Sequence, residues 1–299
     1  MNYQQERFLL LTLDPVHVGT GGNRLGRVDL SIVREPGTRL PKIPGTALHG
    51  AIRQYAAYRY ESRRCAGAGQ DTDENKRHCR DPKCPVCYTF GYINGQDGGQ
   101  SGTVSIGDAR ILLFPVHSLA GPVWVTCPSV LAEFKIEATV SDDRIKSKVG
   151  QAHLNLGWLM LEKESSDFTL PTSVPPEIQS RAVLLSDKLF SQVVNSNLEV
   201  RTSVSIDPET GAAKDGALFT YEAIPRATLL WLEAVQDDYR NAFPQTDKKC
   251  KTGESLGETW RKPLDVVNAG LKLAEYLGIG GMGTRGFGRV RLVNGAVKS

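Results

Sequence analysis

The sequence lacks any long hydrophobic run. Its longest apolar stretches, residues 8–13, 111–116 and 229–232, are far shorter than the roughly 18 residues that a membrane-spanning helix needs. The amino terminus also lacks the basic leader and the small-residue cleavage site of a secretory signal. We therefore expect a cytoplasmic protein that has no membrane partner.

Also absent is the compositional bias that marks disordered, collagen-like or coiled-coil chains. Of the 299 residues, 40% are hydrophobic, 23% are charged and 7% are aromatic. This is the balance of a folded protein that buries a real core. The length alone allows either two domains or one large domain with long insertions.

Charge of one sign is scarce as well, since 36 Lys and Arg stand against 33 Asp and Glu, a formal net charge of +3. The distribution is uneven, however. Residues 24–64 hold nine basic and three acidic residues, and the last 19 residues hold four basic residues and no acid. The two ends of the chain could form one positive groove for a polyanion. Scattered solubilising charge is the equally weighted alternative.

Four of the six cysteines lie within 23 residues, at Cys65, Cys79, Cys84 and Cys87. In a reducing compartment a disulfide framework is the weaker explanation. The Cys84–Cys87 turn suits one tetrahedral metal ion, with Cys79 and Cys65, or His78 in place of either, completing the ligands. A zinc ion would also stabilise the polar segment 67–77, which cannot form a core of its own. Reduced thiols and a redox pair are the alternatives. Cys127 and Cys250 are expected to be structural.

The hydrophobic pattern predicts a mixture of strands and helices. Strands are expected at residues 8–13, 28–33, 111–116 and 289–292, and helices at 187–194, at 264–277 and around Val130. Another helix opens near Pro44, with Thr46 as its N-cap. Its apolar stripe is Leu48, Ala51, Ile52 and Tyr55. The amino terminus of this helix, with Lys42 just upstream, is a physical site for an anion such as phosphate.

Two segments have patterns that matter for function. A regular strand over 28–33 would place Asp29 and Ser31 on the face opposite Val28, Leu30 and Ile32. Residues 198–224 form a candidate hairpin, because strands at 201–206 and 217–224 flank the turn-rich segment 207–211. Its strands are long and polar, so we expect them to project beyond the core.

The densest glycine cluster lies at residues 278–288. Nucleotide-binding loops run from strand to glycines to helix, whereas here a helix comes first and a strand follows. Since no Gly-Lys-Ser/Thr is present either, nucleotide hydrolysis is disfavoured. A loop of exposed N–H groups with Arg285 and Phe287 would suit a sugar-phosphate backbone. A tight structural turn is the alternative.

Several segments together resemble the RAMP proteins of CRISPR systems. They are residues 18–21, residues 41–50, the Cys84–Cys87 pair followed by Phe90-Gly91, and the terminal glycine loop. Residues 112–116, 124–128 and 210–219 are similar to the repeated backbone subunits of type III-B (Cmr) effector complexes. The resemblance spans nearly the whole chain, and the order of these motifs makes it specific.

The resemblance implies an α+β fold with a ferredoxin-like core of the RNA-recognition-motif type, as a single RAMP domain over residues 1–299. Residues 60–100 would then be a cysteine-rich insertion, and residues 198–224 a thumb hairpin. It also implies that copies of the chain stack along a CRISPR RNA together with other type III subunits. Each thumb would distort the guide–target duplex at regular intervals, where an acidic loop residue cleaves the target RNA.

Residue by residue, the resemblance places the catalytic acid at Asp29, a guide-contacting lysine at Lys42 and the helix-start hydroxyl at Thr46. We extend the expected RNA surface along this helix and the glycine loop. The added residues are His49, Arg53, Gly283, Arg285, Gly286 and Phe287. His49 and Ala47 depart from the basic residue and the serine that are common in the family.

The chemistry of such a site can be reasoned independently. The 2′-hydroxyl of RNA is its own nucleophile, so cleavage needs in-line geometry, a base or metal ion, and cations for the developing charge. Asp29 would act as a ligand of magnesium or manganese, or as the base; an ordinary exposed acid is the alternative. The basic residues near it in sequence are Arg24, Arg27 and Arg34. His17 and Glu222 are secondary candidates, and a packed histidine is the simpler explanation of His17.

Two competing hypotheses are weighed against this one. A non-catalytic, zinc-stabilised RNA-binding scaffold would not need the acid at Asp29. A guide-processing nuclease would need a histidine near the glycine loop, and none of the five histidines lies beyond residue 153. The sequence therefore favours an endoribonuclease subunit that a guide RNA organises.

Overall fold

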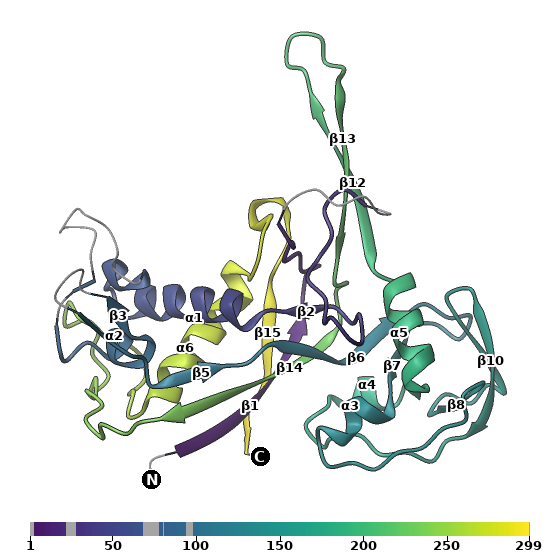
Figure 1. Ribbon diagram of the computed structural model, residues 1–299, viewed down its shortest axis with the longest axis horizontal. Helices are drawn as coiled ribbons and strands as arrows, with labels where there is room; N and C mark the ends of the chain where they lie inside the picture. Colours follow the sequence, from purple (N-terminus) through teal and green to yellow (C-terminus); the bar gives the residue numbers. More distant parts are fainter. Residues whose placement is uncertain (1–2, 22–27, 68–77, 80, 94–97, 299) are drawn as a thin grey trace.

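The computed structural model describes residues 3–21, 28–67, 78–79, 81–93 and 98–298 (Figure 1). Within these ranges, no helix is both long and apolar enough to cross a membrane. The mixed α and β architecture that the sequence predicts is confirmed, with most of the described strands in one large sheet.

The centre of the molecule is an antiparallel sheet with two helices against it. Its elements in chain order are β1 (Tyr3–Thr12), α1 (Gly45–Arg59), β5 (Val104–Ile106), β6 (Ala109–Val116), β14 (Leu229–Asp237), α6 (Pro263–Leu277) and β15 (Val290–Lys298). The long strands lie in the order β15-β1-β14-β6, and each neighbouring pair is antiparallel. Helices α1 and α6 pack against each other beside this sheet (Figure 1).

Burial follows the apolar residues of these elements. Phe8, Leu9 and Leu10 of β1 are all fully buried, so this strand is covered on both faces. In α1, Leu48 and Ile52 of the predicted stripe are fully buried and face the core. The core that the sequence predicts around these two elements is therefore present.

The start of α1 differs from the prediction, because Thr46 is not its N-cap. The helix begins at Gly45, its N-cap residue is Pro44, and no side chain caps it through a hydrogen bond to its own first turn. Instead, the carboxylate of Asp108 accepts the Gly45 N–H at 2.7 Å. A distant acid thus satisfies a donor that a local hydroxyl was expected to satisfy.

Beyond β6, the sheet continues into a second lobe (Figure 1). Its strands are β7 (Val123–Thr126), β8 (Arg144–Ser147), β9 (His153–Leu156), β10 (Leu159–Ser165) and β11 (Ala182–Leu184). Its helices are α3 (Pro128–Ala132), α4 (Pro176–Gln179) and α5 (Asp187–Ser196). Helices α3 and α5 confirm the helical segments predicted around Val130 and at 187–194.

The alternating segment 28–33 is not the regular strand that the pattern predicts. It makes isolated bridges, from Leu30 to Tyr221 and from Ile32 to Gly19. Because successive bridges go to different partners, no continuous ladder forms. The alternation still sorts the side chains in part, since Val28 and Ile32 are buried and Asp29 is exposed.

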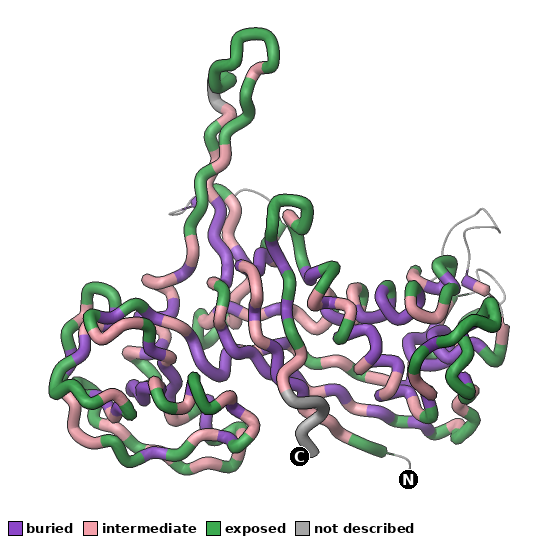
Figure 2. Tube along the Cα trace, turned by 180° about the vertical axis from the view of Figure 1, so that it is seen from behind, coloured by how far each residue is buried: buried purple, intermediate pink, exposed green. Residues whose placement is uncertain are grey.

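A two-stranded hairpin occupies the range predicted for one. Its strands, β12 (Glu199–Ile206) and β13 (Ala213–Ala223), pair with each other in antiparallel register and form a separate two-stranded sheet. The hairpin projects from the body, and the tube in Figure 2 shows mostly exposed residues along its outer part. It leaves the second lobe after α5 and returns to the central sheet at β14.

The cysteine-rich insertion lies between α1 and β5. Its described elements are the short helix η1 (Arg63–Ala66), α2 (Pro85–Phe90), β3 (Tyr92–Ile93) and β4 (Gly99–Gln100). All six residues of α2 are buried, and α2 packs against both α1 and α6. The insertion is thus attached to the helical side of the molecule.

Candidate functional site

Three other segments of the chain, all distant from β13 in sequence, contact the last residues of β13. Val16 bridges to Ile224, and Leu30 bridges to Tyr221. The glycine loop, residues 278–288, joins them because the ring of Phe287 packs edge-to-face on Tyr221 with centroids 5.5 Å apart. We name this region the hairpin base; it comprises residues 14–20, 28–34, 219–224 and 278–288.

Asp29 lies on the surface of the hairpin base, and its carboxylate is held in place. Its Oδ2 accepts hydrogen bonds from the Thr220 backbone N–H at 2.7 Å and from the Thr220 hydroxyl at 2.9 Å. Both hydrogen bonds lower the pKa of Asp29, because they favour its charged form, and the bond from the backbone N–H has the larger effect. Since the side chain is exposed, it is an oriented, ionised carboxylate that a ligand can reach from solvent.

His17 is packed inside the hairpin base with only 6% of its surface exposed. Its Nδ1 lies 2.7 Å from the carbonyl oxygen of Glu222. A carbonyl oxygen only accepts, so Nδ1 carries a proton and donates. The Gly281 N–H in turn donates to the His17 carbonyl at 2.9 Å. These contacts fix the glycine loop to the hairpin, which favours a structural role over a catalytic one.

Glu222 is 7% exposed, and protein groups bind its carboxylate on both oxygens. Arg34 donates to Oε1 at 2.6 Å and to Oε2 at 2.8 Å, and the Ile32 N–H donates to Oε1 at 2.9 Å. The acid is therefore occupied, and so is the guanidinium that was expected beside Asp29. Arg24 and Arg27, the other basic residues expected there, lie outside the described residues.

The glycine loop is folded tightly onto the body. Gly280 has φ of +91°, and a Cβ at this position would lie 2.5 Å from the His17 carbonyl oxygen, so only glycine fits. Six N–H groups of the loop donate to protein carbonyls, and for these the predicted exposure to a ligand is wrong. They belong to Gly278, Ile279, Gly281, Arg285, Gly286 and Gly288.

The side chains of the glycine loop divide into an exposed and a buried set. Gly283, Arg285 and Gly286 are exposed, and the Arg285 guanidinium lies 6.0 Å from the ring centre of Phe219. Phe287 is only 1% exposed. Its burial argues against the predicted contact with RNA, because its ring has no free face on which a base could stack. Arg285 remains accessible.

At the start of α1, Lys42 has a partner within the protein. Its Nζ lies 2.5 Å from Asp108 Oδ2, while Oδ1 of the same carboxylate accepts the Gly45 N–H. Asp108 thus occupies the position at which the sequence predicts a phosphate. Thr46 is exposed beside it. A phosphate bound here would share Lys42 with this acid.

The two other predicted RNA contacts on α1, His49 and Arg53, lie toward the insertion. Arg53 is only 5% exposed, and its guanidinium donates to four backbone carbonyls there, so the geometry argues against contact with RNA. His49 packs edge-to-face on Phe90. Burial, and then the charge of Arg53, lowers the pKa of His49. A neutral ring offers no charge to a phosphate near pH 7.

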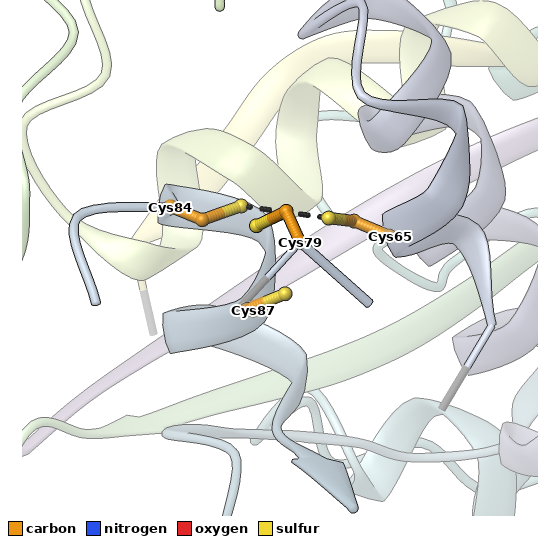
Figure 3. A group of neighbouring side chains, drawn as sticks. All are labelled: Cys65, Cys79, Cys84 and Cys87. Carbon is orange, nitrogen blue, oxygen red and sulfur yellow. Dashed lines mark hydrogen bonds between the residues drawn. The ribbon is translucent and has the colours of Figure 1, made fainter. Parts of the chain in front are cut away.

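The predicted cysteine cluster assembles in space. The sulfur atoms of Cys65, Cys79, Cys84 and Cys87 all lie within 4.8 Å of one another (Figure 3). The sulfurs of Cys65 and Cys84 are 3.8 Å apart. This is far longer than a disulfide bond of about 2.05 Å. It is about the edge of a tetrahedron whose zinc–sulfur bonds measure about 2.3 Å.

His78 does not take a ligand position in this cluster. Its ring lies against that of Tyr92, with centroids 3.9 Å apart. Cys127 and Cys250 also lie apart, since Cys250 Sγ contacts Glu61 and Cys127 Sγ contacts Ser129. Of the ligand sets that the sequence left open, the structure therefore selects the four cysteines as the group able to hold a metal.

Two residues of these sites were missed in the sequence analysis. Thr220, which orients Asp29, lies 191 residues away from it in the chain. Asp108, which pairs with Lys42, is 66 residues away. No spacing pattern links residues so far apart, and only the folded chain brings them together.

Comparison with known proteins identifies similar molecules. The chain is 28% identical over 250 residues to the CRISPR system Cmr endoribonuclease Cmr4 of Pyrococcus furiosus, covering 74% of this chain and 78% of that protein. Cryo-EM structures of type III-B Cmr-beta, in the apo state and bound to cognate target RNA, have TM-scores of 0.66 and 0.65 at 17% and 16% identity. Each match covers 97% of this chain and 96% of the chain in the solved structure. A crystal structure of oligomeric Cmr4 from Pyrococcus furiosus has a TM-score of 0.61 at 21% identity, covering 97% of this chain and 98% of that one.

A family model described as the RAMP superfamily matches residues 9–291. This range includes both central helices, the cysteine-rich insertion, the hairpin and the glycine loop. The resemblance seen in the sequence is thereby confirmed. The chain belongs to the RAMP superfamily, and within it the chain is similar to the Cmr4 subunits of type III-B complexes.

Proposed function

We propose that this chain is a backbone subunit of a type III CRISPR effector. In this proposal it binds CRISPR RNA, stacks with further copies of itself and other subunits, and cleaves complementary target RNA at regular intervals. Its central strand-helix-strand-strand-helix-strand unit is a ferredoxin-like core within a single RAMP domain. The insertion at 60–100 and a thumb hairpin at 198–224 are additions to that core.

The observation that carries the proposal is the position of Asp29. This exposed carboxylate is bonded to Thr220, on a strand of the projecting hairpin. A hairpin that distorts a bound duplex would therefore place the distorted backbone beside the acid. Arg285 on the adjoining glycine loop is exposed and can contact phosphate.

The reaction that suits one carboxylate is attack by the target's own 2′-hydroxyl. The 2′-oxygen bonds to the adjacent phosphorus and releases its proton to solvent, while the bond from phosphorus to the 5′-oxygen breaks and the leaving 5′-oxygen takes up a proton from solvent. The products are a cyclic phosphate and a 5′-hydroxyl, so no water and no protein nucleophile is needed. The low pKa of Asp29 makes it a weak base. Its part is therefore to orient the hydroxyl or to bind a cation.

Asp29 is also the residue that would hold a catalytic magnesium or manganese ion. Among the described residues, no group of three His, Cys, Asp or Glu gathers at the hairpin base. Magnesium is commonly held by one or two carboxylates together with phosphate oxygens of the substrate, which fits a lone Asp29. The ion would neutralise charge that develops on the phosphate.

The test is the Asp29→Ala variant, assembled with guide RNA and given a complementary target. We expect cleavage to be lost and the binding of both RNAs to be kept, because the carboxylate acts in the transition state. His17→Ala and Glu222→Gln are comparison variants for the secondary candidates. Binding without cleavage in the unmodified protein would favour the non-catalytic scaffold. Unchanged cleavage in Asp29→Ala would show that the acid lies elsewhere.

We also propose that the four clustered cysteines hold one structural zinc ion. The supporting observations are their sulfur-only donor set and the proximity of their sulfur atoms. In the absence of a metal, hydrogen bonds from Cys65, Cys84 and Cys87 lower the pKa of Cys79. Cys79 therefore favours its thiolate form, the form in which a cysteine binds a metal.

A further inference from the structure

We propose that Arg53 and Lys251 are the counter-cations of a metal tetrathiolate formed by the four cysteines. This inference rests on the proposed zinc site and is independent of RNA cleavage. A divalent ion with four thiolates has a net charge of −2. One arginine, which precedes the four cysteines in the chain, and one lysine, which follows them, would bring the net charge of the centre to zero.

The first observation is the environment of Arg53. Its guanidinium donates to the carbonyls of Cys65 at 2.9 Å, Gly67 at 2.7 Å and Gly91 at 2.8 Å, all of them neutral acceptors. Among the described residues it forms no ion pair with a carboxylate. Yet it is 5% exposed, and a guanidinium stays charged in proteins.

A buried charge needs an opposite charge nearby, because nothing otherwise compensates for the loss of its hydration. Burial lowers the pKa of the Arg53 guanidinium, and the titratable groups that oppose this effect, when they are thiolates, are Cys87, Cys65 and Cys84. Four neutral thiols, or two disulfides, would leave this guanidinium uncompensated. A metal tetrathiolate supplies the negative charge permanently. The environment of Arg53 thus discriminates between the explanations that the cysteine spacing left open.

The second observation is Lys251, which reaches the cluster from a loop near the carboxyl end. Its N–H donates to the Tyr60 carbonyl at 3.1 Å, which docks the loop beside the end of α1. Favourable electrostatic interactions with Cys79, and then with Cys65 and Cys84, raise the pKa of its ammonium. Cys79 is the partly exposed cysteine of the four. The ammonium is therefore able to balance charge on the cysteine that is nearest to solvent.

The arrangement assigns different tasks to the two cations. Arg53 hydrogen-bonds to the carbonyls of Cys65 and Gly67 on one side of the insertion and of Gly91 on the other. It also balances charge from the buried side. Lys251 balances charge from the exposed side, where Cys79 lies. Groups of this kind, which contact metal ligands rather than the metal, commonly change metal affinity by about 10- to 100-fold when they are removed.

The test uses the full-length chain purified without chelator. Elemental analysis should find about one zinc per chain, and transfer of zinc to a chromophoric chelator then gives the release rate. We expect Arg53→Met to release zinc about 10-fold faster or more, and Lys251→Met to release it several-fold faster. Arg59→Met on the same helix and Lys249→Met on the same loop are the matched controls, and both should release zinc at the parent rate. Cobalt replacement, read by its absorption, reports whether all four thiolates still bind in each variant.

The Arg53→Lys variant separates the effect of the positive charge from the effect of the hydrogen bonds. It keeps the charge but loses the planar guanidinium that donates to several carbonyls. Release from this variant should lie between the parent and Arg53→Met; release as fast as Arg53→Met would overturn the charge assignment. Lys251→Met guards against misfolding, because this residue is exposed. Unchanged release in both Met variants would overturn the inference while leaving the zinc site intact. A protein that binds no zinc would overturn both, and neither result would bear on cleavage at Asp29.

Discussion

Two acids of the hairpin base, Asp29 and Glu222, illustrate how surroundings assign roles to identical chemistry. Glu222 is buried and binds Arg34 through both oxygens. Removing it would leave a partly buried guanidinium unpaired, a change that typically costs about 3–5 kcal/mol of stability. Asp29 is exposed, and Thr220 contacts one of its oxygens. Stability thus depends on Glu222, while Asp29 can act on a bound molecule.

The pH dependence of cleavage should respond to Thr220. The Thr220→Val variant removes the hydroxyl that donates to Asp29 but keeps the backbone N–H. Since hydrogen bonds to the carboxylate lower the pKa of Asp29, losing one should raise that pKa. The carboxylate then protonates at higher pH, so the acid-side fall of the cleavage rate should move upward. Single-turnover rates across the acidic range measure this.

A matched control for this experiment is Thr202→Val. Thr202 pairs directly with Thr220 across the hairpin and is exposed, but in the described part of the chain it makes no hydrogen bond to Asp29. In this variant the cleavage rate should fall at the same acidic pH as in the parent protein. Thr220→Ser, which keeps the hydroxyl, should also have the pH dependence of the parent. An acid limb that stays in place in Thr220→Val would mean that ionisation of Asp29 does not control the rate.

At the scale of elements, the hairpin and the glycine loop form one unit through their aromatic residues. Phe287 and Tyr221 are 1% and 4% exposed, and they pack edge-to-face. Arg201 on β12 lies over the Phe287 ring, 4.7 Å from its centre. The loop therefore acts as a buttress for the hairpin, while its exposed residues face solvent. This explains why the glycine cluster is mainly structural, the alternative that the sequence left open.

Phe287→Ala should consequently destabilise the protein by about 3–5 kcal/mol, because it empties a closed aromatic site. Urea denaturation measures the change in the free energy of unfolding. Phe219→Ala should cost less, since Phe219 is half-buried, and Phe287→Leu should recover part of the loss. We also expect slower cleavage in folded Phe287→Ala, because the strand that positions Asp29 loses its support. A loss below that of Phe219→Ala would contradict the buttress.

At the scale of the whole molecule, a projecting hairpin stands on a packed body. The outer part of the hairpin is mostly exposed and makes its strand pairs within itself (Figure 2). The body contains the central sheet, the second lobe and the cysteine-rich insertion. The hairpin tip therefore contributes little to the stability of the isolated chain. Its apolar residues Val204, Ile206 and Leu218 are exposed, which suits an element that works against a bound partner.

Shortening the hairpin should separate folding from function. Val204 pairs with Leu218, so replacing residues 205–217 by Asn-Gly closes these strands with a two-residue turn. We expect an unchanged melting temperature and zinc content, because the removed tip is not part of the core. Cleavage at regular intervals should be lost, since the duplex is no longer distorted beside Asp29. Cleavage with the original spacing would rule out the thumb role of this hairpin.

Some elements of the structure could be predicted from the sequence and others could not, for clear physical reasons. The helices at 45–59 and 263–277 were predictable, because their apolar periodicity is local and tertiary packing agrees with it. The cysteine cluster was predictable as well, since three of its ligands lie within nine residues. The strand expected at 28–33 was wrong, because its alternation reflects one buried face and not a continuous ladder.

The sequence by itself determined the family and the α and β content, and it singled out Asp29 and the four clustered cysteines as candidate site residues, since each is a property of residue identity or short spacing. Tertiary structure alone decided which charges remain accessible. Arg53, Arg34 and Lys42 are equally basic in the sequence, yet the fold gives them carbonyls, Glu222 and Asp108 as partners. Arg285 stays exposed. The physical reason is that a charge is satisfied by whatever the fold brings within about 3 Å of it, and those partners come from distant parts of the chain.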